Sequence, residues 1–250
     1  MWAPRRLLTA GLLLVCSGVA RSELAYTVAP KTYTESPRTA AIEVRLGGYK
    51  PLIDREKSLT SNVYNEVFGD SAMLLVELEF QKFFYQGIGT AGVGYSIGYA
   101  EKYAHATVVP ADPNTPPTTS SVTTSLKVLP MRLMVLYKMD YLAFHYNVPL
   151  TPYVKAGLNF TPWWASKGGS IDYVNGTRGA GGKWGYGFTA GLGLLLDFFE
   201  PRVARDFDTD IGVNHTYLYA EYTYENVNNF GKAGLDLSSR RWSFGIAFEF

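Results

Sequence analysis

The sequence predicts an all-β chain in which eight antiparallel strands close into an up-and-down transmembrane β-barrel. Three observations predict it. Segments of alternating apolar and polar residues recur along the 250 residues, long polar connections alternate with shorter ones, and the last residue of the closing strand is aromatic, Phe250. Alternation with a period of two is the pattern of a strand with one apolar face. Beyond the N-terminal region, no segment has 18 consecutive apolar residues, so we expect no transmembrane helix.

The composition narrows the classes of function. A formal net charge of +1 does not indicate the broad basic surface that nucleic-acid binding requires. The 25 Gly, 18 Tyr and 14 Phe residues are typical of twisted strands with tight interiors and aromatic belts. The single cysteine, Cys16, lies near the N-terminus. We therefore expect no disulfide and no thiol chemistry in the mature chain, and nothing in the sequence indicates a cofactor.

The N-terminus has the three parts of a secretory signal. Arg5 and Arg6 precede an apolar run over 7–15, which is too short to span a bilayer, and small residues follow at Gly18 and Ala20. We expect a signal peptide over 1–20, with cleavage after Ser22 as the alternative. Val15 stands where lipid attachment at Cys16 would need a small residue, which favours cleavage over lipidation. An extended periplasmic lead-in over 21–38 and a barrel domain over 39–250 would follow.

Eight segments have the alternation of membrane strands, and each is as long as the roughly 9–11 residues that a tilted crossing needs. They cover residues 40–50, 72–83, 88–103, 122–138, 152–164, 183–198, 214–226 and 241–250. The clearest is 183–198, where aromatic and aliphatic residues alternate with glycines and Thr189. The connections after the first, third, fifth and seventh strands are long and polar, which is the pattern of external loops.

Two places depart from simple alternation. In 122–138, Leu126 and Val128 share one parity whereas Met131 and Leu133 share the other, with Pro130 at the change. We expect a β-bulge there, because a bulge re-phases a strand and tolerates proline. Residues 199–212 predict one or two helical turns, with Pro201 early in the helix.

The polar residues that alternate with the apolar ones along each strand predict a charged interior. Eight strands leave a lumen that side chains just fill. Carboxylates and basic residues alternate with the apolar file on several strands, and mixed signs indicate ion pairs rather than a wide pore. The expected lumen polar network consists of Glu43, Arg45, Glu77, Glu79, Lys155, Glu221, Arg241 and Glu249.

Most of the chain after the N-terminal signal resembles a known family, most strongly over about the last 60 residues. The stretch LLLDFFEP over 194–201, then Phe207-Asp208, then GVNHTYLYAEY over 212–222, resembles an uncharacterised family of outer-membrane β-barrel proteins typical of myxobacteria, and WSFGIAFEF over 242–250 matches it too. The layout is also similar to small OmpA/OmpX-type barrels. The resemblance implies a barrel surrounded by bacterial outer-membrane lipid, and supplies no activity, ligand or catalytic residue.

The last strand resembles the closing strand of outer-membrane barrels in detail. There, a C-terminal aromatic residue is a recognition signal for the barrel-assembly machinery, so the resemblance implies that machinery as a partner during biogenesis. The expected barrel-closing signal is the apolar file Trp242, Phe244, Ile246, Phe248 and Phe250.

Asp206, Asp208 and Asp210 alternate along the chain, as the ligands of a calcium-binding loop do. An EF-hand loop needs Gly at its sixth position and Glu at its twelfth, and counting from Asp206 these are Ile211 and Tyr217. The motif therefore fails. A solvated turn with capping carboxylates is favoured over a looser calcium site, and we expect no metal ligands.

A lipid-modifying hydrolase would need a His, a Ser and an acid at the outer membrane surface. His105 is four residues after Glu101, and Ser120 and Ser121 lie across the next loop, but no nucleophile motif surrounds them. We expect no catalytic residues. The favoured interpretation is a non-enzymatic structural or surface-interaction protein with four external loops. The alternatives are a narrow channel for ions or small solutes, the lipid-modifying hydrolase, and a soluble lipocalin-like barrel around an apolar ligand.

Overall fold

The structure is a computed structural model, and it describes residues 37–56, 61–108, 118–174, 176–232 and 234–250. The expected signal peptide and almost all of the lead-in fall outside these residues. No helix within the described ranges is long and apolar enough to cross a membrane.

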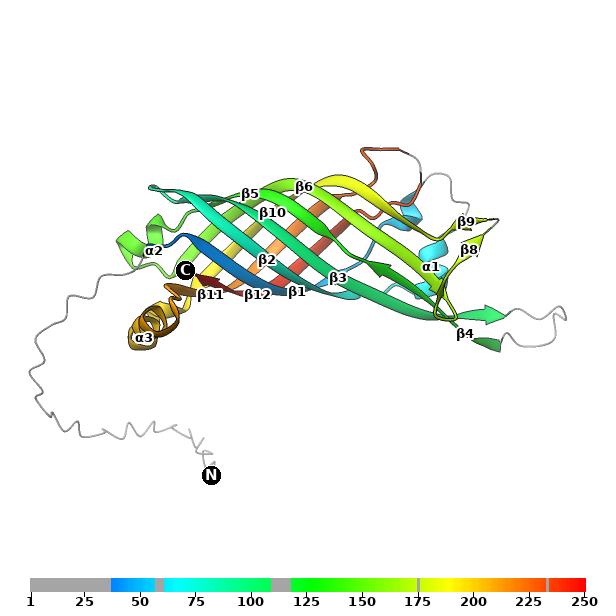
Figure 1. Ribbon diagram of the computed structural model, residues 1–250, viewed down its shortest axis with the longest axis horizontal. Coiled ribbons are helices and arrows are strands. Elements are labelled where there is room, and N and C mark those ends of the chain that lie inside the picture. The colour runs from blue at the N-terminus through cyan, green and yellow to red at the C-terminus, as the bar shows by residue number, and fades with distance from the viewer. Residues whose placement is uncertain (1–36, 57–60, 109–117, 175, 233) are drawn as a thin grey trace, which may run out of the picture. The chain divides into compact units, whose positions relative to one another are not determined.

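The main sheet closes on itself (Figure 1). Each strand pairs antiparallel with its neighbours, and β12 pairs with β1 to complete the ring. β4 and β5 follow one another along the same path, since both pair with β3 and with β6. The ring therefore has eight strands, and the prediction of a closed antiparallel barrel is confirmed. Its elements are β1 Ala40–Tyr49, β2 Met73–Gln86, β3 Thr90–Val108, β4 Thr118–Val128 with β5 Met131–Lys138, β6 Leu150–Lys167, β10 Ala180–Leu195, β11 His215–Asn226 and β12 Ser239–Glu249.

Side chains alternate between an interior and an exterior face, with the phase that the sequence predicts. On β10, the even-numbered residues from Trp184 to Leu192 are exposed, while Lys183 and Thr189 of the other file are buried. On β12, Trp242 and Phe244 are exposed and Arg241 and Glu249 are buried. The barrel is thus polar inside and apolar outside, the opposite of a lipocalin-like barrel.

The predicted bulge at Pro130 is wrong. Ile97 of β3 pairs with Met131, and Ala100 pairs with Val128. Both strands therefore advance by three residues between these pairs, and no extra residue is inserted. Gly98 donates its N–H to the Pro130 carbonyl at 2.7 Å, and the register continues unchanged. Proline interrupts the strand only because it has no N–H. The apolar parity changes because Leu126 and Val128 face inward, where they join an apolar cluster.

The two ends of the barrel differ (Figure 1). The terminal end carries Pro37 and Phe250, together with helices α2 (Tyr141–Tyr146) and α3 (Pro201–Ile211). The loop end carries η1 (Ile53–Arg55), α1 (Val63–Phe68) and the short strands β7 Ser170–Ile171, β8 Tyr173–Val174 and β9 Thr177–Arg178. The helices of the 51–70 connection were not expected from its polar composition.

The expected turn around Asp206 is also wrong. All three aspartates lie within α3, an eleven-residue helix that begins with Pro201 and ends at Gly212 in the left-handed conformation. The helix is longer than the one or two turns expected. Among the described residues, no group of three or more His, Cys, Asp or Glu side chains is arranged to hold a metal ion.

Glycines let neighbouring strands approach within the ring, and Gly157 is a tight case to test. A Cβ at Gly157 would collide with the Leu133 carbonyl oxygen and lie 2.7 Å from the Met134 Cα. We expect Gly157→Ala to lower the free energy of unfolding by roughly 1–3 kcal/mol, the usual cost of overpacking. The matched control is Gly94→Ala, whose Cβ would meet nothing closer than the Met134 Cγ at 3.3 Å. Urea unfolding in lipid vesicles measures both variants, and equal losses would contradict backbone crowding at Gly157.

Candidate functional site: the filled lumen

Arg45 is at the centre of the interior. Its guanidinium contacts the carboxylates of Glu79 and Glu221 directly and lies 3.9 Å from those of Glu43 and Glu77. Strand β1 places Glu43 and Arg45 on the inward face two residues apart, and its register sets Glu43 opposite Glu79 and Arg45 opposite Glu77. Four carboxylates thus surround one guanidinium, which supplies five N–H donors in a rigid fork.

Lys155 of β6 provides a second cation for the same carboxylates. Its Nζ lies 2.6 Å from Glu43, 2.8 Å from Glu79 and 3.7 Å from Glu221. Gln81 donates its amide to both Glu43 and Glu79, at 2.6 and 2.7 Å. The negative charges that would repel one another across this layer are therefore separated by cations and an amide.

A second layer lies toward the loop end. Arg241 contacts Glu225 directly and Glu77 at 3.1 Å, and Arg132 lies 3.6 Å from Glu77 and 3.7 Å from Glu225. Asn159 donates to Glu225 at 2.9 Å. Glu77 contacts cations of both layers, so the network is continuous along the barrel axis.

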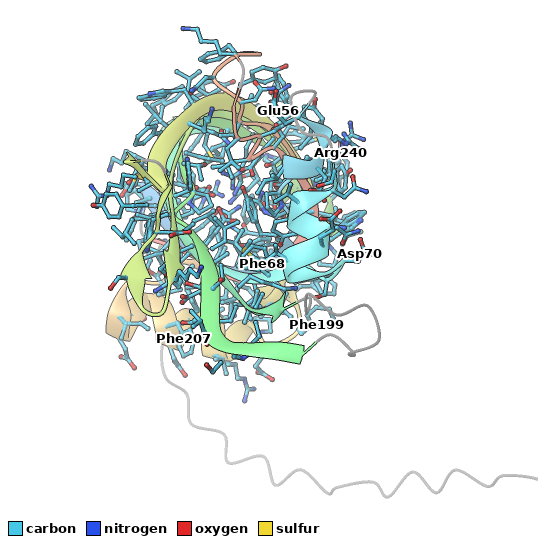
Figure 2. All side chains as sticks on the ribbon, turned by 90° about the vertical axis from the view of Figure 1, so that its right-hand side faces the viewer. Glu56, Phe68, Asp70, Phe199, Phe207 and Arg240 are labelled. Atoms are coloured by element: carbon cyan, nitrogen blue, oxygen red, sulfur yellow. The ribbon has the colours of Figure 1, made fainter. Side chains whose placement is uncertain are left out.

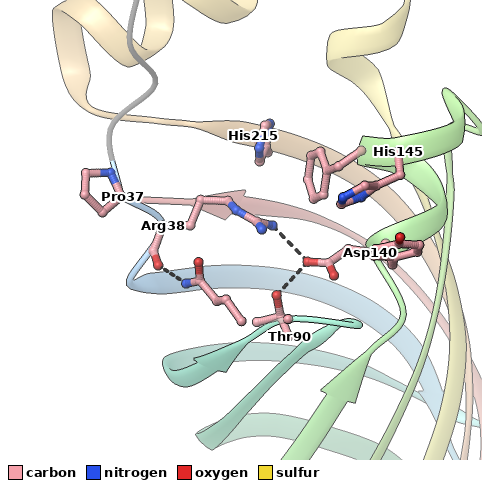
Figure 3. Close-up of a pocket in the computed structure, with 10 residues that line it drawn as sticks. Pro37, Arg38, Thr90, Asp140, His145 and His215 are labelled. Atoms are coloured by element: carbon pink, nitrogen blue, oxygen red, sulfur yellow. Dashed lines mark hydrogen bonds and ion pairs between the residues drawn. The ribbon is translucent and has the colours of Figure 1, made fainter.

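A third layer lies at the terminal end. Lys138 contacts Glu249 directly, and Arg38 lies 3.5 Å from Glu249 and 2.8 Å from Asp140. Figure 3 shows Arg38 and Thr90 converging on Asp140, with the Thr90 hydroxyl donating at 2.6 Å. Burial lowers the pKa of Arg38, but the charges of Glu249 and Asp140 outweigh that effect and raise it, so this cation stays charged.

The charges of the ion-paired network nearly balance. Seven carboxylates meet six cations, and all of these side chains are buried apart from the partly exposed Arg38. A buried ion without a partner costs several kcal/mol, so the network is tolerable only because its members are paired. The carboxylates are Glu43, Glu77, Glu79, Asp140, Glu221, Glu225 and Glu249, and the cations are Arg38, Arg45, Arg132, Lys138, Lys155 and Arg241.

An apolar plug fills the loop end of the interior (Figure 2). Asp54 accepts the backbone N–H groups of Tyr64 and Asn65, at 2.7 and 3.1 Å, and so fixes the start of α1. The cluster consists of Tyr49, Ile53, Tyr64, Met73, Leu75, Ala100, Leu126, Val128, Val227 and Leu237. Burial, with a smaller contribution from the Asp54 charge, raises the pKa of Tyr64 to about 12, so the plug carries no phenolate at neutral pH.

The terminal end is hollowed just beyond the third layer. A pocket of about 480 Å³ lies between Arg38, Asp140 and the histidines of α2 and β11. His215 is held by Asp197, whose carboxylate is 2.6 Å from the His215 Nδ1, and Phe144 packs on the ring. His145 stacks on Tyr141. Asp140 is engaged by Arg38 and Thr90 at one side of the pocket, as Figure 3 shows.

All eight residues of the expected network lie in the interior, and the structure brings them together. The alternation over 214–226 also predicts that Glu225 faces inward, as it does, whereas Arg132, Lys138 and the pair at the mouth, Arg38 and Asp140, were not predicted. Arg132 and Lys138 alternate with Leu133, Val135 and Tyr137, and that alternation could have located them. The parity change at Pro130 obscured the signal, because the even-numbered residues before it are apolar.

Glu101 and His105, which a lipid-modifying hydrolase would use, lie on the exterior of the loop end. Glu101 accepts from the Tyr99 hydroxyl at 2.7 Å and pairs with Lys127 at 2.9 Å. His105 is exposed and lies opposite Thr123 on β4. Ser121 lines a separate hollow of about 600 Å³ with Lys127, Ser125 and Ser166. Glu101 is therefore engaged by Lys127 and Tyr99.

Comparison with known proteins gives likeness at the level of structure. No family model matches the chain, and no curated protein sequence matches it. OprG from Pseudomonas aeruginosa, an outer membrane protein, is 13% identical with a TM-score of 0.48, covering 85% of this chain and 97% of its own. Ail from Yersinia pestis, the attachment invasion locus protein, solved with the heparin analogue sucrose octasulfate, is 14% identical with a TM-score of 0.42 and the same coverage. The outer membrane enzyme PagL is 9% identical with a TM-score of 0.35, covering 84% and 98%. At these values the assignment of the fold depends on the strand pairing above.

The lumen network makes a clear prediction at Arg241. We expect Arg241→Met to lower the free energy of unfolding by roughly 3–5 kcal/mol, because Glu77 and Glu225 would lose their strongest partner while remaining buried. The control is the adjacent Arg240→Met, whose exposed guanidinium lies over the Tyr224 ring at 5.3 Å and whose loss should cost about 1 kcal/mol or less. Denaturant unfolding measures both, and similar losses would show that the network does not stabilise the barrel.

Proposed function

We propose that the protein is a sealed barrel of the bacterial outer membrane, a structural or surface-interaction protein that does not conduct. The observation that supports this most directly is the filled interior. Three layers of ion pairs extend from the terminal end, and the apolar plug with α1 follows at the loop end. Side chains that bind one another this way leave no continuous row of free polar groups for permeating ions.

Membrane insertion is supported by the exterior face. From Trp184 to Leu194 the outward file of β10 extends over ten residue steps, about 33 Å along the strand. A tilt of roughly 35–45° reduces this to about 25 Å, the usual height of the apolar band of outer-membrane barrels. Large apolar side chains on this face are exposed on every part of the ring, for example Leu46, Leu74, Leu133, Leu158 and Phe244. In water such an apolar surface would drive aggregation, whereas in a bilayer it would contact apolar acyl chains.

The orientation is proposed from the connections. At the loop end all the connections are longer than a turn, and they carry η1, α1 and three short strands. At the terminal end β2 and β3 are joined through a short turn, and the two other connections carry α2 and α3. In outer-membrane barrels the longer loops are external. The loop end would then face outward, and the terminal end, with Pro37 and Phe250, would face the periplasm. Strands β3 and β6 are the longest of the ring, and β4 pairs with both of them at the loop end.

Within this proposal, the apolar file of β12 serves as the signal that the barrel-assembly machinery recognises. Trp242 and Phe244 of this file are exposed on the outer wall. Phe250 donates its N–H to the Ala40 carbonyl at 2.8 Å, so the last residue also closes the ring against β1.

Bilayer recordings test the proposed absence of conduction. Purified protein is refolded into lipid vesicles, and a faster gel mobility without boiling, lost on boiling, shows that the barrel is inserted and closed. The same preparation is fused to a planar bilayer, and we expect no steady current, because ion pairs and the plug occupy the lumen. A reproducible unitary conductance from closed barrels would contradict the proposal and favour the narrow channel.

A further inference from the structure

Helix α3 is an unusual addition to the terminal end, because its apolar side chains are exposed. It joins β10 to β11 after the short helix η2 (Leu196–Phe198) and has no buried residue. Ile211 at its end is 63% exposed, and Val203 and Phe207 are exposed as well. These three residues are spaced by four, so they lie along one side of the helix. Phe199, which precedes the helix, is 62% exposed.

The helix has two clearly different faces. At 100° per residue, Val203, Ala204, Phe207 and Ile211 fall within about 100° of arc. Arg202, Arg205, Asp206 and Thr209 fall on the opposite side. This division is typical of helices that lie in the interface of a bilayer, with the apolar side in the acyl region and the charged side in water.

The sequence of α3 does not favour a stable helix in isolation. Eleven residues is shorter than the roughly 12–15 that an isolated helix needs in water. Asp208 and Asp210 are in its last turn, where the partial negative charge of the helix dipole disfavours carboxylates. Burial of the apolar face is therefore the interaction that the helix needs.

The position of α3 favours lipid as the partner of that face. The helix lies outside the barrel wall, seen nearly end-on in Figure 1, so its axis lies across the barrel axis. Val203, Ala204 and Phe207 line a hollow of about 140 Å³ with Leu196 and Thr216. Leu196 and Phe198 continue the outward file of β10, and Phe199 follows them. The apolar face thus continues the exterior face at the periplasmic edge of the proposed membrane zone.

We propose that α3 is an interfacial helix that inserts its apolar face into the periplasmic leaflet of the outer membrane. This inference rests on the membrane-spanning barrel proposed above. In this position the helix would anchor the periplasmic rim of β10 and β11 and fix how deep the barrel sits. Arg202, Arg205 and Asp206 would lie toward the lipid headgroups or water, and Asp208 and Asp210 at the two margins of the inserted face.

Fluorescence quenching by brominated lipid tests the position of the helix. Single cysteines are introduced in a Cys16→Ser background at Ile211 and Val203 on the apolar face, Asp206 on the polar face, and Leu158 on the barrel wall. Each carries an environment-sensitive fluorophore, and gel mobility without boiling shows that each barrel has folded. We expect Ile211→Cys and Val203→Cys to be quenched about as strongly as Leu158→Cys, and Asp206→Cys to be quenched weakly and to remain accessible to aqueous iodide.

The controls separate this inference from the proposed function. If Leu158→Cys is quenched while both apolar-face labels behave like Asp206→Cys, the barrel spans the bilayer and the interfacial helix is wrong. If Leu158→Cys is not quenched, the membrane-spanning proposal fails and α3 loses its partner with it. If the apolar-face labels are shielded from iodide but not quenched by lipid, a second copy or another protein segment covers the helix, which also overturns the inference.

Discussion

Pairing of buried charge is the constraint on which the rest of this structure depends. The inward files of eight strands converge on an interior with room for side chains and little else. Arg45, Arg241 and Lys155 occupy it together with carboxylates from β1, β2 and β11. Each charge is acceptable there only beside its partner, so the register of the strands that carry them, β1, β2, β5, β6, β11 and β12, is fixed by where these charges must lie.

Crowding by these long side chains explains the glycines of the same files. A Cβ at Gly191 would lie 2.8 Å from the Tyr153 ring atom Cε1, and one at Gly98 would lie 2.6 Å from the Glu77 Cγ. Long side chains therefore lie against glycines across the interior, as close packing requires. The exterior has no such restriction, so its files consist of large apolar residues. The same alternation thus produces a packed polar interior and an apolar wall.

Much of the architecture could be predicted from the sequence, because period-two alternation determines both strand and face. The eight strands, the inward placement of Glu43 or Glu221, and the outward placement of Trp242 follow from parity alone. What could not be predicted depends on contacts distant in sequence. Leu126 and Val128 suggested a bulge because nothing in the local pattern shows that apolar residues face inward where they meet α1. The plug itself could not be predicted, because residues 51–70 are rich in polar residues and nothing local shows that Ile53 and Tyr64 face inward. The alternating aspartates of α3 suggested a solvated turn, although the same segment also predicted one or two helical turns; the structure extends the helix through all three aspartates.

We propose that the outward face of every strand of the ring contacts lipid and that the inward faces enclose paired charge. Consecutive labels at Leu133, Met134, Val135 and Leu136 on β5 test it most directly, in vesicles that contain brominated lipid. We expect strong quenching at Leu133 and Val135, because both side chains are exposed on the outer wall. We expect weak quenching at Met134 and Leu136, because both are buried in the interior. Uniformly weak quenching along the strand, or alternation in the opposite phase, would contradict it.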